Sequence, residues 1–102
     1  MSKKFYVLSE IADKDLEDIF DFTNNKFGFD QAEKYLLEID DIFQKLVQNP
    51  KIGKQRNEIK SGLYSFPKDN HIIFYRVLVS HIRIVRILHG SRDLPKYLDE
   101  IL

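Results

Sequence analysis

The sequence predicts an α+β fold in which an N-terminal strand is followed by an antiparallel helical hairpin, a three-stranded antiparallel sheet and a short C-terminal helix. Two observations lead to this prediction. Apolar residues recur at helical spacing in two long stretches before residue 50, and short apolar segments separated by turn residues fill 58–90. We expect residues 1–102 to form a single domain, because a chain of this length buries roughly two-thirds of its unfolded surface around one core.

The first expected elements are a strand and a helix. Residues 5–8 form an apolar run that is too short for a helix and rich in strand-forming residues. The apolar stripe of the helix consists of Leu16, Ile19, Phe20, Thr23 and Phe27. Gly28 follows this stripe directly, and a glycine in this place typically ends a helix.

A second helix is expected to follow at once and to pack antiparallel to the first. Asp30 and Glu33 have the spacing of a capping box, which predicts a helix start at Asp30. The apolar stripe consists of Ala32, Tyr35, Leu36, Ile39, Phe43, Leu46 and Val47. Asn49 and Pro50 stop the helix, because proline disfavours helical backbone in the residue before it.

The second half of the chain is expected to form the sheet. Residues 51–60 have the composition of a polar, basic loop. The predicted strands are 63–66, 71–79 and 82–89, with turns at 67–70 and 80–81. The helical spacing of Leu94, Tyr97, Leu98 and Ile101 then predicts a C-terminal helix, with Asp93 at its cap and Pro95 in its first turn.

The predicted strand 71–79 is apolar on both faces, which is typical of a central strand. Its alternating sets are Ile72, Phe74 and Leu78 on one face and Ile73, Tyr75 and Val77 on the other. One helical hairpin covers only one face of a sheet. The second face is therefore either a partner-binding groove rimmed by arginines or a mildly apolar surface in contact with solvent.

Charge is distributed unevenly along the chain, although the net charge is zero. Residues 1–50 contain 6 basic and 11 acidic side chains, whereas 51–102 contain 10 basic and 5 acidic ones. The arginines are Arg56, Arg76, Arg83, Arg86 and Arg92, all in the second half. This asymmetry predicts an anionic partner, unless the two halves neutralise each other within the fold. Arg76 and Arg86 lie in apolar segments, so each needs a carboxylate, from Glu58, from the helical half or from a partner.

Several function classes are excluded by what the sequence lacks. The absence of Cys excludes disulfides and thiolate ligands and fits a cytoplasmic location. We see no leader and no apolar run long enough to span a membrane, so we expect neither export nor a membrane partner. No phosphate loop, metal-binding motif or nucleophile elbow occurs, so we expect no metal and no cofactor. His89, near Arg86 and Arg92, is either a general acid or a structural, hydrogen-bonded residue.

Several segments resemble the ParE toxins of the ParE/RelE superfamily, a group that includes the plasmid stabilisation proteins. They are the Phe27-Gly28 junction, NP-x-x-G at 49–53, EI-x-x-GL-x-x-FP at 58–67, HxIFYR at 71–76 and RILH at 86–89. The resemblance covers nearly the whole chain. It implies a strand, a helical hairpin and a three-stranded antiparallel sheet, in the order that periodicity predicts.

The resemblance implies the toxin of a type II toxin-antitoxin module. A ParD-like antitoxin would wrap its C-terminal segment around the toxin and bind operator DNA with its other end, so DNA would be contacted only indirectly. ParE-type members inhibit DNA gyrase and block replication, whereas RelE-type relatives are metal-independent endoribonucleases that cut messenger RNA on the ribosome. Ile72 stands where ribonuclease branches place an arginine, which favours gyrase inhibition. The alternatives are ribosome-dependent cleavage and a non-toxic, partner-binding member.

Three sets of candidate residues accompany this resemblance. The candidates for antitoxin binding are Arg76, Arg83, Arg86 and Tyr75. The candidates for gyrase binding lie in the C-terminal segment and are Arg92, Lys96, Tyr97 and Leu98. In the ribonuclease alternative the candidate catalytic residues are Lys54, Arg56, His89, Arg92 and Tyr97.

Overall fold

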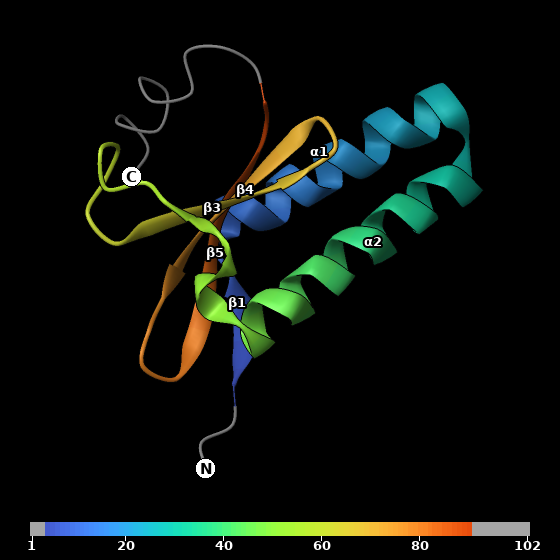
Figure 1. Ribbon diagram of the computed structural model, residues 1–102. Helices are drawn as coiled ribbons and strands as arrows, with labels where there is room; N and C mark the ends of the chain where they lie inside the picture. The colour runs from blue at the N-terminus through green and yellow to red at the C-terminus, as the bar shows by residue number, and fades with distance from the viewer. Residues whose placement is uncertain (1–3, 91–102) are drawn as a thin grey trace.

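The computed structural model describes residues 4–90 and arranges them as a helical hairpin on one mixed sheet (Figure 1). In chain order the elements are β1 (Phe5–Leu8), α1 (Glu10–Phe27), α2 (Phe29–Gln48), the 3-10 helix η1 (Pro50–Ile52), β2 (Lys54–Gln55), β3 (Leu63–Lys68), β4 (His71–Val77) and β5 (His81–His89). The predicted α+β class is confirmed, while the predicted C-terminal helix lies outside the described residues. Neither described helix is long and apolar enough to cross a bilayer.

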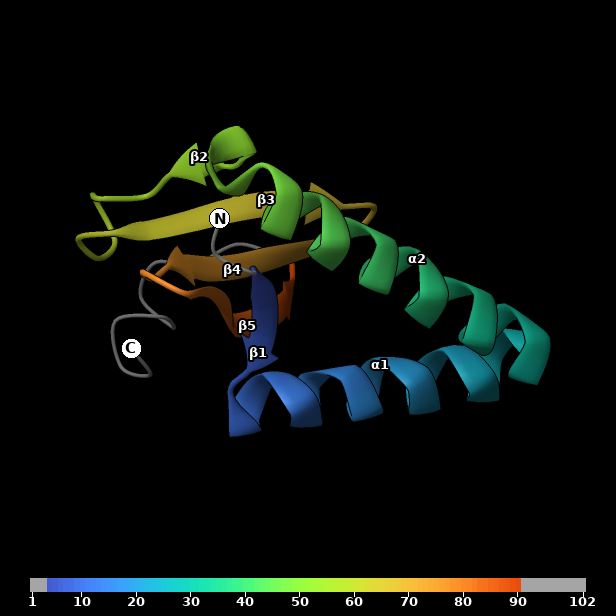
Figure 2. The same cartoon turned by 90° about the horizontal axis from the view of Figure 1, so that it is seen from below.

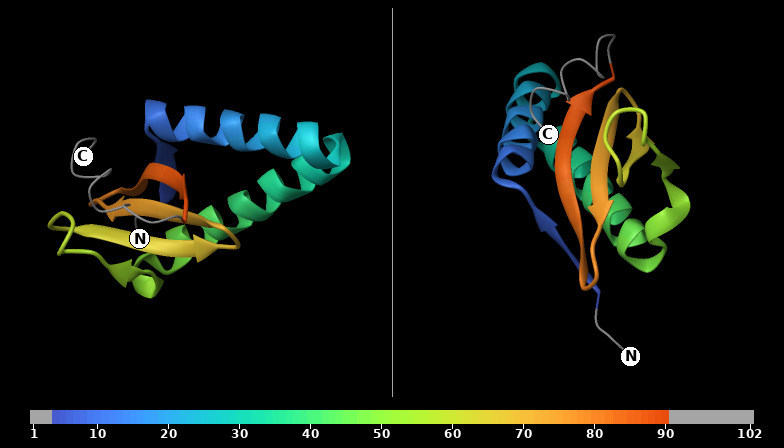
Figure 3. Two further views of the ribbon diagram at one scale, coloured as in Figure 1. Left: turned by 90° about the horizontal axis from the view of Figure 1, so that it is seen from above. Right: turned by 90° about the vertical axis from the view of Figure 1, so that its left-hand side faces the viewer.

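The sheet has the strand order β1-β5-β4-β3-β2, so β4 is the central strand, as predicted. β1 pairs with β5 in parallel, and the other neighbours are antiparallel. β1 forms one edge of the sheet beside β5 (Figure 3). The predicted first strand thus joins the predicted three strands in one sheet, and β2 adds a fifth strand at the opposite edge.

The helical hairpin covers one face of the sheet, here called the hairpin face. α1 lies against β5, α2 lies against β1, and the closed end of the hairpin projects beyond the sheet (Figure 2). The central buried side chains of this layer are Ile39, Phe43 and Leu46 from α2 and Ile73, Tyr75 and Ile84 from the sheet. Burial of these apolar side chains fixes the hairpin on the sheet.

The opposite face, here called the outer face, has its own apolar cluster. Its buried members are Leu63, Phe74, Val85 and Leu88, with Ile59 and Ile72 packed against them. The second apolar face is therefore present as predicted. The cluster is already buried, however, so neither an open groove nor a solvent-exposed surface exists at these four positions.

A β-bulge divides β5 into two parts. Arg86 and Ile84 pair with consecutive residues of β4, which leaves Val85 as an extra residue. An extra residue exchanges the two faces for everything that follows it. Ile84 and Ile87, three residues apart, therefore both pack in the core of the hairpin face. His89 follows Ile87 by two residues and lies on this same face.

The helix starts differ from each other. Ser9 caps α1, because its Oγ accepts a bond from the backbone N–H of Ala12 at 2.9 Å. Gly28 ends α1 with φ 96°, as predicted, and is also the N-cap of α2. The predicted capping box is wrong: α2 has no side-chain cap, and Ala32 donates to the Gly28 carbonyl at 3.1 Å. Since α2 starts directly after this shared glycine, Asp30 already belongs to its first turn.

Strand lengths also differ from the predictions. Lys54 and Gln55 were expected in a loop but form β2, which pairs with residues 64–65 of β3 and is too short to show alternation. β3 continues through Pro67 to Lys68, where the sequence predicted a turn. Pro67 has no backbone N–H to donate. It is tolerated because β2 pairs only with residues 64–65 and therefore requires no hydrogen bond from position 67. β4 ends two residues earlier than expected.

Candidate functional site

Two arginines face each other across neighbouring strands on the outer face. Arg76 of β4 and Arg83 of β5 are direct cross-strand partners. Arg76 donates from Nη1 to the Ser61 carbonyl at 3.0 Å, and Arg83 is exposed. Within residues 4–90 neither arginine forms an ion pair with a carboxylate. Like charges directly opposite each other destabilise a sheet, so this pair is a site where an anion would bind favourably.

Exposed apolar side chains adjoin this arginine pair. Phe5 and Val7 of β1 are 49% and 37% exposed. Val7 is the register partner of Arg83, so an apolar and a charged side chain lie side by side on the outer face. The Phe5 ring stacks on His81 with a centroid distance of 5.3 Å. We call Phe5, Val7, Arg76 and Arg83 the basic patch.

Arg56 extends the positive charge of the outer face toward β2. Its Nε donates to Ser65 Oγ at 2.8 Å, and its Nη1 lies 3.4 Å from Glu58 Oε2. Glu58 therefore pairs with Arg56 and not with Arg76 or Arg86. The backbone hydrogen bond to the Glu58 carboxylate lowers the pKa of this group most, and the hydrogen bond from the Arg56 guanidinium lowers it further, against a smaller opposing effect of desolvation.

Arg86 has an internal partner, in contrast to the other two strand arginines. Its Nε and Nη2 donate to Asp15 Oδ2 and Oδ1 at 2.8 and 3.0 Å, and both side chains are nearly buried. Asp15 Oδ2 also accepts the backbone N–H of Ile87 at 3.0 Å, where the edge of β5 extends beyond β1. The sequence predicted that Arg86 needs a carboxylate partner, and Asp15 on α1 supplies it from the helical half of the chain. We do not retain Arg86 as an antitoxin contact, because it joins α1 to the sheet.

Tyr75 is a core residue. Its side chain is fully buried, and its hydroxyl donates to the Pro50 carbonyl at 2.7 Å and accepts from Gly53 N–H at 3.1 Å. Burial raises the pKa of this hydroxyl. A partner cannot contact Tyr75 without opening the core, so we do not retain it as an antitoxin contact either. Its role is to hold the NP-x-x-G segment against the sheet.

The candidate ribonuclease residues within the described range do not converge. Lys54 pairs with Ser65 on the outer face, and Arg56 hydrogen-bonds to the same serine. His89 lies on the hairpin face, where it lines a cavity with α1 residues. β2 and β5 are also three strand spacings apart, about 14 Å. The other two ribonuclease candidates, Arg92 and Tyr97, lie outside the described residues, as do the gyrase-binding candidates Lys96 and Leu98.

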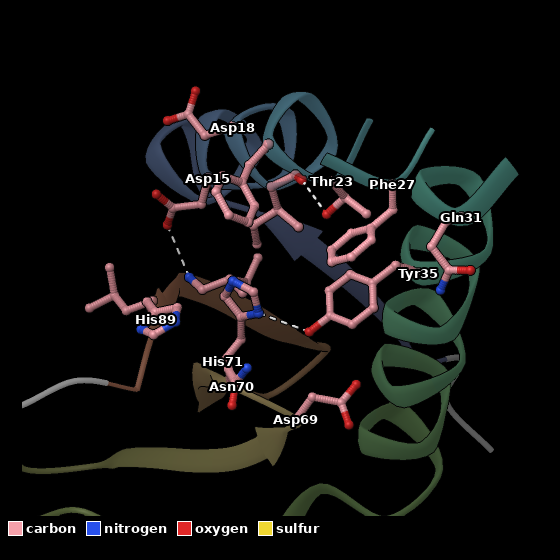
Figure 4. Close-up of a pocket in the computed structure, with 14 residues that line it drawn as sticks. Asp15, Asp18, Thr23, Phe27, Gln31, Tyr35, Asp69, Asn70, His71 and His89 are labelled. Carbon is pink, nitrogen blue, oxygen red and sulfur yellow. Dashed lines mark hydrogen bonds between the residues drawn. The ribbon is translucent and has the colours of Figure 1, made fainter. Parts of the chain in front are cut away.

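A cavity of about 570 Å³ opens between the hairpin and the ends of β4 and β5 (Figure 4). Phe22 and Phe27 of α1 contribute apolar side chains to its lining, and the imidazoles of His71 and His89 contribute from the sheet. Tyr35 Oη lies 2.8 Å from His71 Nδ1. Burial, followed by the proximity of His89, lowers the pKa of His71, and burial raises the pKa of Tyr35.

No pattern in the sequence predicts this cavity. Of the two histidines that line it, only His89 is a candidate residue from the sequence. His71 and His89 lie side by side because they are register partners on β4 and β5, and this register depends on the bulge at Val85. Spacing along the chain does not contain that information.

Comparisons with known proteins agree on one family. A family model described as the ParE toxin of the type II toxin-antitoxin system parDE matches residues 6–94. Toxin ParE1 of Mycobacterium tuberculosis (strain ATCC 25618 / H37Rv) is 38% identical over 94 residues, which cover 91% of this chain and 96% of that protein. Toxin ParE1 of Caulobacter vibrioides is 30% identical over 95 residues, covering 93% and 98% of the two chains.

A solved structure shares the fold. A chain of the chromosomal ParDE TA system from P. aeruginosa superimposes with a TM-score of 0.73 and 22% sequence identity, covering 89% of this chain and 98% of that one. At this identity the likeness concerns the fold alone. The helical hairpin and the mixed sheet are therefore found in a chain of a ParDE system.

Proposed function

The chain belongs to the ParE toxin family, and we propose that it acts as the toxin of a ParDE-type toxin-antitoxin pair by inhibiting DNA gyrase in the cytoplasm. The family match and the identity to two curated ParE1 toxins support the toxin role. Gyrase inhibition is the finer part of the proposal. It follows from the ParE branch of the superfamily and from the departure at Ile72, where a ribonuclease would need a cation for its phosphate.

The position of the basic residues supports gyrase inhibition over RNA cleavage. Metal-free phosphodiester cleavage requires a general acid and phosphate-binding cations around one substrate. Here Lys54 and Arg56 are on the outer face and His89 is on the hairpin face. One phosphodiester cannot contact both groups. We propose that the target is instead bound by the C-terminal segment with Arg92, Lys96, Tyr97 and Leu98.

A ParD-like antitoxin is the partner that we propose for the basic patch. The observation that carries this proposal is the cross-strand pair Arg76 and Arg83, which has no carboxylate within the described residues. An acidic segment would relieve the repulsion between the two guanidinium groups. Apolar side chains on the same segment would pack on Phe5 and Val7, which are partly exposed. The expected partner is therefore an acidic, amphipathic segment that folds on binding.

A gyrase supercoiling assay with the purified full chain tests the target. We expect inhibition of supercoiling, with intact messenger RNA in a parallel assay on translating ribosomes. Arg92→Ala should weaken inhibition, whereas Lys26→Ala, at the closed end of the hairpin, should not. Cleaved messenger RNA with normal supercoiling would show that the chain acts as a ribonuclease. No effect in either assay would indicate a non-toxic, partner-binding member.

Binding of a purified ParD-like antitoxin tests the basic patch. Arg83→Glu should raise the Kd by about tenfold or more, because it places a like charge against the acidic segment. Lys14→Glu is the matched control, since Lys14 is an exposed cation on α1 that already pairs with Asp18. Equal affinities of the two variants would show that the antitoxin binds elsewhere, without affecting the family assignment.

A further inference from the structure

Two imidazoles form a cross-strand pair at the mouth of the cavity. His71 begins β4, His89 ends β5, and the two residues are direct register partners. Both side chains line the cavity on the hairpin face, and their ring centroids are 5.6 Å apart (Figure 4). Neighbouring positions on antiparallel strands hold two side chains at a fixed short distance. Two nitrogen ligands are thus presented together.

The ring separation suits a shared metal ion. A Zn²⁺–N bond of about 2.1 Å places each ring centre about 3.2 Å from the metal, so two rings at a tetrahedral angle have centres about 5.2 Å apart. The observed 5.6 Å differs from this by only a few tenths of an ångström. The rings are now edge-to-face, with an interplanar angle of 80°. The interplanar angle does not oppose chelation, because two imidazoles can bind one ion at any angle between their planes, and the centroid distance already fits the present strand positions.

The hydrogen bonds leave the required nitrogen free. Tyr35 Oη lies within bonding distance of both His71 Nδ1, at 2.8 Å, and the Lys68 carbonyl, at 3.3 Å. When the hydroxyl donates to the carbonyl, it accepts from Nδ1–H, and the lone pair of His71 is then on Nε2. This is the outer-sphere arrangement that orients a metal-binding histidine. His89 is exposed and is the ring that can turn.

We propose that His71 and His89 form an exchangeable binding site for a divalent transition-metal ion of the zinc type. Residues 4–90 contain no group of three or more potential metal ligands, so water must complete the coordination. Asp69 and Asp15, which also line the cavity, pair with Lys68 and Arg86. The cavity is large enough for the bound waters. Imidazole is a preferred ligand of Zn²⁺ and Cu²⁺, and a bound ion would tie the end of β5 to the start of β4.

Titration calorimetry of the full chain with Zn²⁺ tests this site. We expect saturable 1:1 binding that His89→Asn removes. His81→Asn is the matched control, because His81 lies at the other end of β5, stacked on Phe5, and should keep wild-type affinity. Absence of binding to the wild type, equal binding to His89→Asn, or loss of binding in His81→Asn would each overturn the proposal.

A positioning role for Tyr35 is tested separately. Tyr35→Phe removes the oxygen that orients His71 and should weaken Zn²⁺ binding by about tenfold. Nuclear magnetic resonance of the imidazole nitrogens shows whether the variant is folded and which rings bind. Zn²⁺ should shift the signals of His71 and His89 but not those of His81. Shifts confined to His81, or spread evenly over the three rings, would contradict the assignment.

Discussion

The ion pair between Asp15 and Arg86 provides the most direct test of how the hairpin is attached to the sheet. Asp15→Ala removes both charge-assisted bonds to Arg86 and the acceptor of the Ile87 backbone N–H. The side chains of Asp15 and Arg86 are only 11% and 12% exposed, so water does not readily replace the lost carboxylate. Leaving one partner of a buried pair uncompensated costs about 3 to 5 kcal/mol. The unpaired amide overlaps with this loss, so we expect about 4 kcal/mol in total.

A loss of this size is a large fraction of the stability of a small domain, which is about 5 to 15 kcal/mol. Urea denaturation followed by circular dichroism should therefore show a much lower midpoint for Asp15→Ala. Asp18→Ala is the matched control on the same helix, because Asp18 pairs with Lys14 at the surface, where both side chains are more than half exposed. Its midpoint should stay close to wild type. Equal midpoints of the two variants would refute the reasoning that Arg86 depends on Asp15.

Three further predictions concern the apolar core, the close packing of Gly53 against the sheet, and stability at alkaline pH. Phe74→Ala should reduce the free energy of unfolding by about 3 to 5 kcal/mol, because Phe74 is 1% exposed, whereas Phe22→Ala, at a position that is 63% exposed, should have little effect in the same denaturation assay. Gly53→Ala should destabilise by about 1 to 3 kcal/mol, because the added Cβ would lie 2.6 Å from the Ser65 carbonyl oxygen and against the Tyr75 hydroxyl; a wild-type melting temperature would contradict this. Burial, together with Asp40, raises the pKa of Tyr6 to about 12, so the folded state holds this proton more tightly than the unfolded state. The stabilisation by this proton is complete below about pH 10 and is lost as pH rises toward about 12. Tyr6→Phe should therefore reduce the pH dependence of the free energy of unfolding between these values. The same pH dependence in the variant and the wild type would show that ionisation of Tyr6 is not linked to unfolding.

The C-terminal ends of the two helices could be predicted because they depend on single residues with strong backbone preferences. Gly28 adopts a positive φ that other residues rarely adopt, and Pro50 cannot continue α2. The start of α2 was predicted wrongly, because the sequence pattern at Asp30 is equally compatible with a residue inside the first turn. β2 escaped prediction because two paired residues show no periodicity.

The roles of the site residues could be predicted less well. An arginine in an apolar strand predicts that an anion is nearby, but it does not say whether the anion is internal. Arg86 forms an ion pair with Asp15, which lies 71 residues away in the chain. Arg76 instead donates a hydrogen bond to a backbone carbonyl and lies opposite Arg83. The aromatic ring of Tyr75 was equally compatible with an interface and with a core, and its two hydrogen bonds to the η1 segment place it in the core.

The sequence by itself determined the fold class, the order of the main elements, the ends of α1 and α2 and the family, because these depend on local backbone chemistry, periodicity and motifs within short segments. Only the tertiary structure decided which charges are paired, which face each strand residue occupies and which residues meet in the cavity. The physical reason lies in the β5 ladder. One extra residue, Val85, exchanges the two faces of the strand, and it thereby buries Leu88 on the outer face and places His89 beside His71.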